Sequence, residues 1–194
     1  ITYNLDNSIT FFGGIHRGFA PPRIKDAISN SGTSLRLEAE LSWNSEIGTR
    51  INFNEILFLE LTGYMLDFSN QVIPVSESSG GAGTGLVNGG KTIHKGVEAS
   101  FRFDIGRLIK SEYGLTAGTN DTYSKSEYNA DRFVTRDNIT TNIKGNRLPY
   151  APEYYLSGSI DIFAPFGFGI QLSGTYVAEQ FTDELNTIQA AANG

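Results

Sequence analysis

Residues 35–51 have the sequence LRLEAELSWNSEIGTRI, in which two sets of side chains alternate. The odd-numbered set is mostly apolar: Leu35, Leu37, Ala39, Leu41, Trp43, Ser45, Ile47, Thr49 and Ile51. The even-numbered set is polar, charged or glycine: Arg36, Glu38, Glu40, Ser42, Asn44, Glu46, Gly48 and Arg50. Because successive side chains of a β-strand point to opposite faces, this stretch predicts a strand with one apolar and one polar face.

The length of this alternation indicates where the strand lies. Strands of globular proteins usually have about 3–10 residues, and a strand that crosses a bilayer needs about 9–11. The pattern here persists over the whole of residues 35–51, which is longer than either. We therefore expect a membrane-crossing strand whose surplus stands above the membrane as a raised barrel wall.

Six further segments alternate less perfectly and predict further strands: residues 8–19, 57–69, 87–103, 113–124, 147–162 and 168–181. The connections between them are short at residues 52–55, 106–112 and 164–167, and long and polar at residues 20–34, 70–85 and 125–146. Outer-membrane barrels have short periplasmic turns and longer extracellular loops. The sequence thus predicts an all-β fold, an antiparallel up-and-down segment of a transmembrane β-barrel with about seven long strands.

The composition agrees with this fold and excludes several others. The chain has 194 residues, 39% of them hydrophobic, with 13 Phe, 9 Tyr, 22 Gly and no Cys. No run approaches the roughly 18–20 apolar residues of a membrane-spanning helix. The absence of Cys excludes a disulfide scaffold and a thiolate metal site, and the net charge of −6 argues against binding of nucleic acid through its phosphates.

The number of predicted strands bears on the domain organisation. Seven strands are an odd number, whereas bacterial outer-membrane barrels have an even number and leave no open edge. The chain also begins at Ile1 without Met or a secretory signal. We therefore expect residues 1–194 to be an internal segment of a longer chain.

Five strings of residues resemble those of TonB-dependent outer-membrane receptors in their order and spacing. They are His16 to Pro22 (HRGFAPP), Trp43 to Arg50 (WNSEIGTR), Asn88-Gly89-Gly90 leading to Gly96-Val97-Glu98, Gly145 to Glu153 (GNRLPYAPE), and Phe181-Thr182-Asp183 followed by Asn186-Thr187. The first string is similar to a signature of the ferric-citrate-like branch of that family.

The resemblance implies a 22-stranded barrel with an amino-terminal plug, of which residues 1–194 would be a partial β-barrel domain in the later half. The plug and the final strands would lie outside these residues. The implied function is that of an outer-membrane active-transport receptor, not an enzyme and without a cofactor, in a Gram-negative bacterium. Its implied partners are the lipid bilayer, a ferric chelate (an iron–siderophore or ferric citrate), and the TonB complex, which would act through the missing plug segment.

Cations near the long connections are candidates for binding an anionic chelate, because arginine forms paired, charge-assisted hydrogen bonds with carboxylates. Arg17, Arg23 and Lys25 lie around the first long connection, and Arg132, Arg136, Lys144 and Arg147 lie around the third. We select Arg17, Arg23, Arg136 and Arg147 as candidate ligand-binding residues. Solvated loop charges are the simpler explanation for any one of them, and the odd number of Arg17 assigns it to the outward, apolar set.

His16 and His94 are the only two histidines, and both fall on predicted inward faces. No H-x-x-x-H spacing suggests a metal site, and no G-x-S-x-G string suggests a hydrolase, so no metal-binding or catalytic residue is predicted. Polar lining of the barrel interior explains both histidines. His94, near the extracellular end of its strand, is added to the candidate ligand-binding residues.

Two other classes of protein remain open on the sequence alone. The first is a self-contained small outer-membrane barrel of 8 or 10 strands, with a structural, adhesive or enzymatic role. A sheet that closes on itself within these residues would favour it. The second is a soluble all-β binding domain, against which the nearly uninterrupted apolar outward face of residues 57–65 argues.

Overall fold

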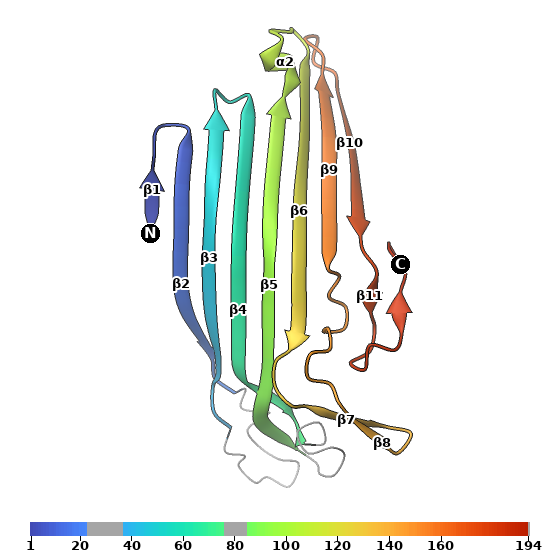
Figure 1. Cartoon of the computed structure of the whole chain (residues 1–194). Coiled ribbons are helices and arrows are strands. Elements are labelled where there is room, and N and C mark those ends of the chain that lie inside the picture. Colours follow the sequence, from blue (N-terminus) through green and yellow to red (C-terminus); the bar gives the residue numbers. More distant parts are fainter. Residues whose placement is uncertain (23–36, 76–84, 194) are drawn as a thin grey trace.

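A computed structural model describes residues 1–22, 37–75 and 85–193 of the chain. Eight strands form one antiparallel sheet in the order β1-β2-β3-β4-β5-β6-β9-β10 (Figure 1). The strands are β1 (Thr2–Asn4), β2 (Ile9–Ala20), β3 (Glu40–Phe53), β4 (Leu57–Pro74), β5 (Leu86–Asp104), β6 (Gly114–Tyr128), β9 (Tyr154–Phe163) and β10 (Gly169–Val177). The seven predicted long strands are confirmed, and the short β1 is added at one edge.

The pairing register carries the two predicted faces across the sheet, because residues directly opposite each other in an antiparallel pair share a face. One apolar row runs through Ile47, Gly63, Val97 and Tyr123. In β9 and β10 the apolar set is even-numbered, since Ala117 pairs with Ile160 and Ile160 with Leu172. The apolar face is therefore continuous from β2 to β10.

The apolar face is not covered by any other part of the described chain. Ile15, Ile47 and Leu172 expose 72%, 74% and 63% of their surface. A soluble domain would bury such a face, whereas a barrel wall presents it to lipid and keeps its polar face toward the lumen. Within the described ranges, no helix has the length and hydropathy needed to cross a membrane.

The short connections gather at one end of the sheet, as predicted (Figure 1). Three residues, Asn54 to Ile56, connect β3 to β4, because Phe53 pairs with Leu57. Asn54 and Glu55 both have positive φ, 50° and 57°, as in the type I′ turns of hairpins. The connection between β5 and β6 contains one helical turn that the sequence analysis did not foresee, α2 (Ile105–Leu108), capped by Asp104. An ion pair between Glu55 and Arg107 ties these two connections together.

Several strand ends differ from the prediction at the end of the sheet where the long connections lie. Residues 37–39 are irregular, so β3 begins at Glu40, and residues 35–36 lie outside the described part. Strand β9 begins at Tyr154, not at residue 147, because Pro149 and Pro152 have no N–H group with which to continue a ladder. Strand β10 ends at Val177, and Gln180–Phe181 forms a separate short strand, β11, which pairs with β12 (Gln189–Ala190).

The second and third long connections contain more structure than predicted. Strands β4 and β5 continue to Pro74 and from Leu86, with irregular register between Phe68 and Val72. The third connection folds into a hairpin of β7 (Phe133–Arg136) and β8 (Ile139–Asn142). Its turn residues Asp137 and Asn138 have φ of 51° and 63°, again the type I′ geometry.

Two large aromatic residues on the luminal face lie against glycines. A Cβ atom on Gly48 would lie 2.5 Å from the ring of Phe12, and one on Gly96 would lie 2.9 Å from the hydroxyl of Tyr64. Phe12 interrupts the apolar–polar alternation of its strand, and the space above Gly48 accommodates its ring on the polar face. Arg50 lies over the same ring, 5.8 Å from its centre, and pairs with Glu60 at 2.5 Å.

Replacing Leu61 by Arg should destabilise the barrel in a bilayer by about 2–4 kcal/mol, because this side chain faces outward near the middle of the apolar band. The matched control is Thr62→Arg, which adds the same side chain to the luminal face one residue away. We expect a much smaller effect from the control. Denaturant titration in lipid vesicles measures both, and equal destabilisation by the two changes would contradict the assignment of faces.

Candidate functional site

A hollow lies on the luminal face toward the end with the long connections. It has a volume of about 880 Å³ and is lined by His16, Glu46, Tyr64, Phe68, His94 and Glu98, among others. These six residues come from β2, β3, β4 and β5, and all are even-numbered, so the same alternation that forms the polar face brings them together. Aromatic surfaces with a few polar groups are typical of small-molecule binding sites.

His94 is held in a fixed orientation within this luminal hollow. Its Nδ1 lies 2.8 Å from the hydroxyl of Ser126, and its Nε2 lies 3.4 Å from the hydroxyl of Thr92. The edge of the imidazole meets the ring of Phe68, with 5.5 Å between the ring centres and an interplanar angle of 82°. The hydroxyl groups and the aromatic ring together position the imidazole in the wall.

His16 lies on the same face, in the same row as Asn44 and Leu66, but is more exposed. Its Nε2 is 3.9 Å from Glu46 Oε1, and 68% of its side chain is accessible. In the described ranges 1–22, 37–75 and 85–193, no group of three or more His, Cys, Asp or Glu residues could hold a metal ion. The luminal hollow offers hydrogen bonds, aromatic contacts and two carboxylates.

Arg17 lies on the opposite, outward face, as its odd number predicted. It pairs in register with Trp43, and its guanidinium carbon is 5.5 Å from the centre of the indole ring. A cation over an aromatic face is attracted by the ring quadrupole. The structure therefore separates Arg17 from His94, while Arg23 and Lys25 lie outside the described residues.

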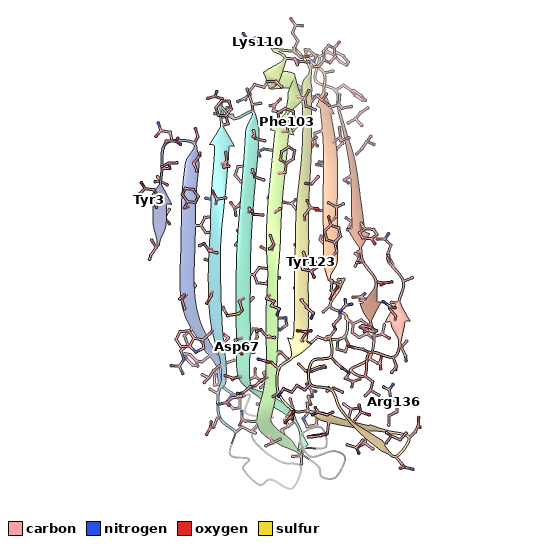
Figure 2. The ribbon with its side chains drawn as sticks, viewed as in Figure 1. Tyr3, Asp67, Phe103, Lys110, Tyr123 and Arg136 are labelled. Carbon is pink, nitrogen blue, oxygen red and sulfur yellow. The ribbon has the colours of Figure 1, made fainter. Side chains whose placement is uncertain are left out.

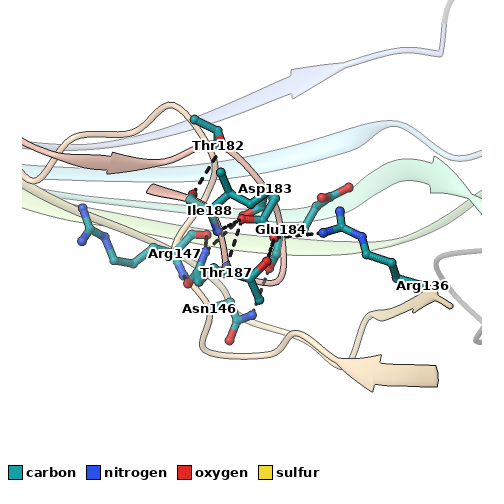
Figure 3. Close-up of polar contacts among 9 residues, drawn as sticks. Arg136, Asn146, Arg147, Thr182, Asp183, Glu184, Thr187 and Ile188 are labelled. Atoms are coloured by element: carbon teal, nitrogen blue, oxygen red, sulfur yellow. Dashed lines mark hydrogen bonds and ion pairs between the residues drawn. The ribbon is translucent and has the colours of Figure 1, made fainter. Parts of the chain in front are cut away.

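The other two candidate arginines lie in a junction between two connections (Figure 3). We call Arg136, Asn146, Arg147, Asp183 and Asn186 the loop junction. Asp183 is only 5% exposed and accepts hydrogen bonds from the backbone N–H groups of Thr187 at 3.0 Å and Ile188 at 2.7 Å. Arg136 Nη1 reaches Asp183 Oδ2 at 3.5 Å, which links the β7–β8 hairpin to the segment between β11 and β12.

In the same junction, asparagine side chains bond to backbone groups both as acceptors and as donors. Asn186 accepts a hydrogen bond from the N–H of Arg147 at 2.7 Å and donates one to its carbonyl at 2.9 Å. Asn146 donates to the carbonyl of Glu184 at 2.9 Å. Because one asparagine satisfies both backbone groups of Arg147, the two irregular segments are paired without forming a strand ladder.

The guanidinium of Arg147 is engaged inside the protein. It lies 5.2 Å from the ring centre of Phe181, its Nε is 3.4 Å from Glu153, and only 19% of the side chain is accessible. Arg132 lies over the ring of Tyr128 at 4.9 Å, and Lys144 is 3.7 Å from Asp131. Arg136 keeps 45% of its side chain accessible. Most cations of the third connection thus have partners within the chain.

The buried position of Asp183 opposes its ionisation, but its hydrogen-bond donors favour the charged form. Burial raises its pKa, whereas the bonds from Ile188 and Thr187 and the nearby guanidinium of Arg136 lower it. The net result is a pKa below the ordinary value for aspartate. Ionised Asp183 therefore stabilises the loop junction at neutral pH.

The loop junction connects two strings that the sequence analysis had treated separately. Residues 145–153 and 181–187 lie about forty positions apart, yet Arg147 and Asn186 bond directly. Neither Asp183 nor Asn186 was selected as a candidate site residue. The spacing of Asp183 to Thr187 and Ile188 is compatible with a side chain that caps its own turn, but the contact of Asn186 with Arg147 has no local signal in the sequence.

An antiparallel meander with an apolar outward face and a polar luminal face is the wall of a transmembrane β-barrel. The model of the family described as "TonB dependent receptor-like, beta-barrel" matches residues 1–193, and the chain belongs to this family. The resemblance seen in the sequence is thereby confirmed.

Solved structures of several receptors share the fold. The ferric yersiniabactin uptake receptor FyuA from Yersinia pestis is 20% identical with a TM-score of 0.71, and the match covers 98% of this chain and 27% of that one. For the ferric citrate transporter FecA the values are 22%, 0.74, 98% and 28%. For the siderophore receptor PiuA from Acinetobacter baumannii they are 17%, 0.72, 98% and 27%. The chain thus spans little more than a quarter of each.

Replacing Asp183 by Asn should loosen the loop junction. We expect roughly tenfold faster hydrogen exchange at the N–H groups of Thr187 and Ile188 at pH 7, because the ionised acceptor and its pairing with Arg136 are lost. The matched control is Asp137→Asn, which removes the same charge from the exposed turn between β7 and β8.

The pH dependence provides a second criterion in the same experiment. The pKa of Asp183 is lowered on folding, so its contribution is complete above the unfolded value of about 3.9 and is lost as the pH falls through the lower folded value. After correction for intrinsic exchange, wild-type protection should stay constant from pH 7 to about pH 4 and fall below that. Asp183→Asn should show no such fall, and a fall of the same size in this variant would disprove the assignment.

Proposed function

We propose that residues 1–194 are part of the barrel wall of an outer-membrane active-transport receptor for a ferric chelate, an iron–siderophore or ferric citrate. The receptor is energised by TonB through a plug segment outside these residues and resides in a Gram-negative outer membrane. The observation that carries this proposal is the family match over residues 1–193. The chain's part is to bind and position the cargo, without covalent chemistry.

The open edges of the sheet support the idea of a longer barrel. In the described part of the chain, β1 pairs only with β2 and β10 only with β9. A strand edge in lipid leaves N–H and C=O groups without partners, which costs several kcal/mol per group, so barrels close. The small, self-contained barrel considered above would require these edges to meet, and the sheet order contains no such pairing. Strands supplied by flanking sequence satisfy the same requirement.

The position and chemistry of the luminal hollow support cargo binding there. It lies near the end of the sheet where the long connections gather, which is the extracellular end in barrels of this kind. His16, Tyr64, Phe68 and His94 present aromatic and hydrogen-bonding groups to the lumen. The carboxylates of Glu46 and Glu98 repel an anionic chelate there. The proposal therefore requires cations elsewhere in the wall or loops to balance the charge of the chelate. Arg136, with nearly half its side chain accessible, is a described candidate.

The names of the structural neighbours support iron as the cargo. Two of the receptors are described as binding or transporting ferric yersiniabactin and ferric citrate, and a third as a siderophore receptor. Their likeness to this chain establishes the fold, and the cargo of this chain is the part we propose.

Uptake by cells that depend on the full-length protein tests the function. Cells given radiolabelled ferric citrate, a panel of ferric siderophores, cobalamin or a labelled sugar should accumulate at least one ferric chelate and neither cobalamin nor the sugar. Deletion of TonB in the same cells should abolish that uptake. Accumulation of cobalamin or the sugar alone, or uptake that persists without TonB, would contradict the proposal.

The luminal hollow can be tested within the same assay. Replacing His94 by Ala should raise the chelate concentration for half-maximal binding by roughly fivefold, the effect expected from losing one hydrogen-bonding and stacking partner. The control Thr175→Ala truncates a luminal side chain of β10 that does not line the hollow. If His94→Ala and the control both bind like the wild type, the cargo does not contact this part of the wall.

A further inference from the structure

Two lysines face each other on the outward side of the sheet. Lys95 of β5 and Lys125 of β6 are direct partners in the antiparallel register, so both project from the apolar face. Like charges directly opposite each other destabilise a sheet. A charged ammonium on a lipid-facing strand is also costly unless it reaches the interface or finds a partner. The pair therefore needs an explanation outside the strand pairing itself.

The protein supplies only part of the counter-charge. Lys125 forms an ion pair with Glu127 at 2.6 Å. Lys95 is exposed, and no hydrogen bond or ion pair joins it to any described residue. Two more acids lie on this face nearby. Asp67 is one row further toward the long connections, opposite Ile93, and Asp121 is two rows toward the short turns, where it accepts a hydrogen bond from the hydroxyl of Tyr154. The ammonium group of Lys95 thus has no paired counter-charge among the described residues, and it lies beside the ammonium group of Lys125, which is paired with Glu127.

The height of the pair places it at one boundary of the apolar band. Lys95 lies eight residues from Phe103, which pairs with Leu57 next to the short β3–β4 turn. Eight residues of a strand tilted by about 40° rise about 21 Å, and the apolar band of such barrels is about 25 Å tall. The lysines therefore reach the interface on the side of the long connections, where the head groups of the outer leaflet lie.

On the side of the short turns, the outward face next to the lysines is mostly apolar and is indented. Met65, Val97, Ile47 and Tyr123 line a shallow hollow of about 1270 Å³ together with Lys95 and Lys125. The row that contains Ile47, Val97 and Tyr123 also contains Gly13 and Gly63, and Gly63 has only a backbone oxygen within 4 Å of where its Cβ would be. Missing side chains in this row leave room for acyl chains between the larger residues.

We propose that this outward surface binds one phosphate-bearing acylated lipid of the outer leaflet. The phosphate lies between Lys95 and Lys125, next to Met65, which pairs with Lys95, and the acyl chains run down the indented apolar face over Val97 and Gly63. The charges are complementary, because a phosphate of about two negative charges compensates both ammonium groups, including the one that Glu127 does not pair. The inference rests on the outer-membrane location proposed above.

Lipid binding by the purified full-length protein tests the inference. The probe is lipid A with two phosphates, added at known concentration and followed by native mass spectrometry. Removing each lysine, in Lys95→Ala and Lys125→Ala, should weaken binding about fivefold, and the double variant should lose correspondingly more. Replacement of both by Arg should keep the affinity. Lys110→Ala removes the same charge from the opposite end of the barrel and should change nothing (Figure 2).

Two further arms identify the group that is recognised. Dephosphorylated lipid A should bind as weakly to the wild type as the intact lipid binds to the double alanine variant. Inorganic phosphate at millimolar concentration should not displace the lipid. Equal binding of both lipids, displacement by inorganic phosphate, or unchanged binding by the double variant would overturn the proposal. Heat-modified mobility on gels checks that every variant forms a barrel.

Ferric-chelate uptake by the same variants separates this inference from the proposed function. Uptake with no lysine-dependent lipid binding would refute the lipid site and leave the transport proposal intact. Lysine-dependent lipid binding without uptake of any ferric chelate would retain the lipid site and refute the cargo.

Discussion

Backbone hydrogen bonding across an unbroken register is the constraint on which this structure depends. A strand surrounded by lipid on one side can satisfy its N–H and C=O groups only with its neighbours. The register from β2 to β6 proceeds without a shift over most of its length, and β9 and β10 continue it. Because a slip of one residue would exchange the two faces, every luminal or outward side chain owes its position to this register.

The register ends where the chain leaves the apolar band, and side chains then replace the ladder. Beyond Phe68 the β4–β5 pairing becomes irregular, and Pro149 and Pro152 keep β9 from extending. In that region Asp183 and Asn186 bond to backbone groups that have no strand partner. In the loop junction, side chains therefore supply the hydrogen-bond partners that neighbouring strands supply to the backbone within the sheet.

The part of the fold that follows from alternation could be predicted from the sequence, including both faces and seven long strands. The part that depends on the ends of ladders could not. The alternation around residues 147–153 continues through two prolines, and only their missing N–H groups show that the strand begins later. The β7–β8 hairpin had a usable signal in Asp137-Asn138 between β-branched residues. The pairing of Arg147 with Asn186 had none, because nothing in either segment specifies a partner so far along the chain.

The candidate site shows why charge alone is a weak guide to ligand binding in such a wall. Arg147 was selected as a loop cation, but its guanidinium contacts Glu153 and Phe181, and its backbone N–H donates to Asn186. Arg17 is available, but it faces outward over Trp43. His94 was selected because it belongs to the inward, even-numbered set and lies near the extracellular end of its strand, and it lines the luminal hollow. The alternation along a strand decides whether a side chain faces the lumen or the lipid. Contacts with other residues of the chain then decide whether its charged group is free to bind cargo. A cation counts toward cargo binding only when both conditions hold. Arg17 fails the first and Arg147 the second, whereas Arg136, on the separate β7–β8 hairpin, keeps 45% of its side chain accessible while it pairs with Asp183.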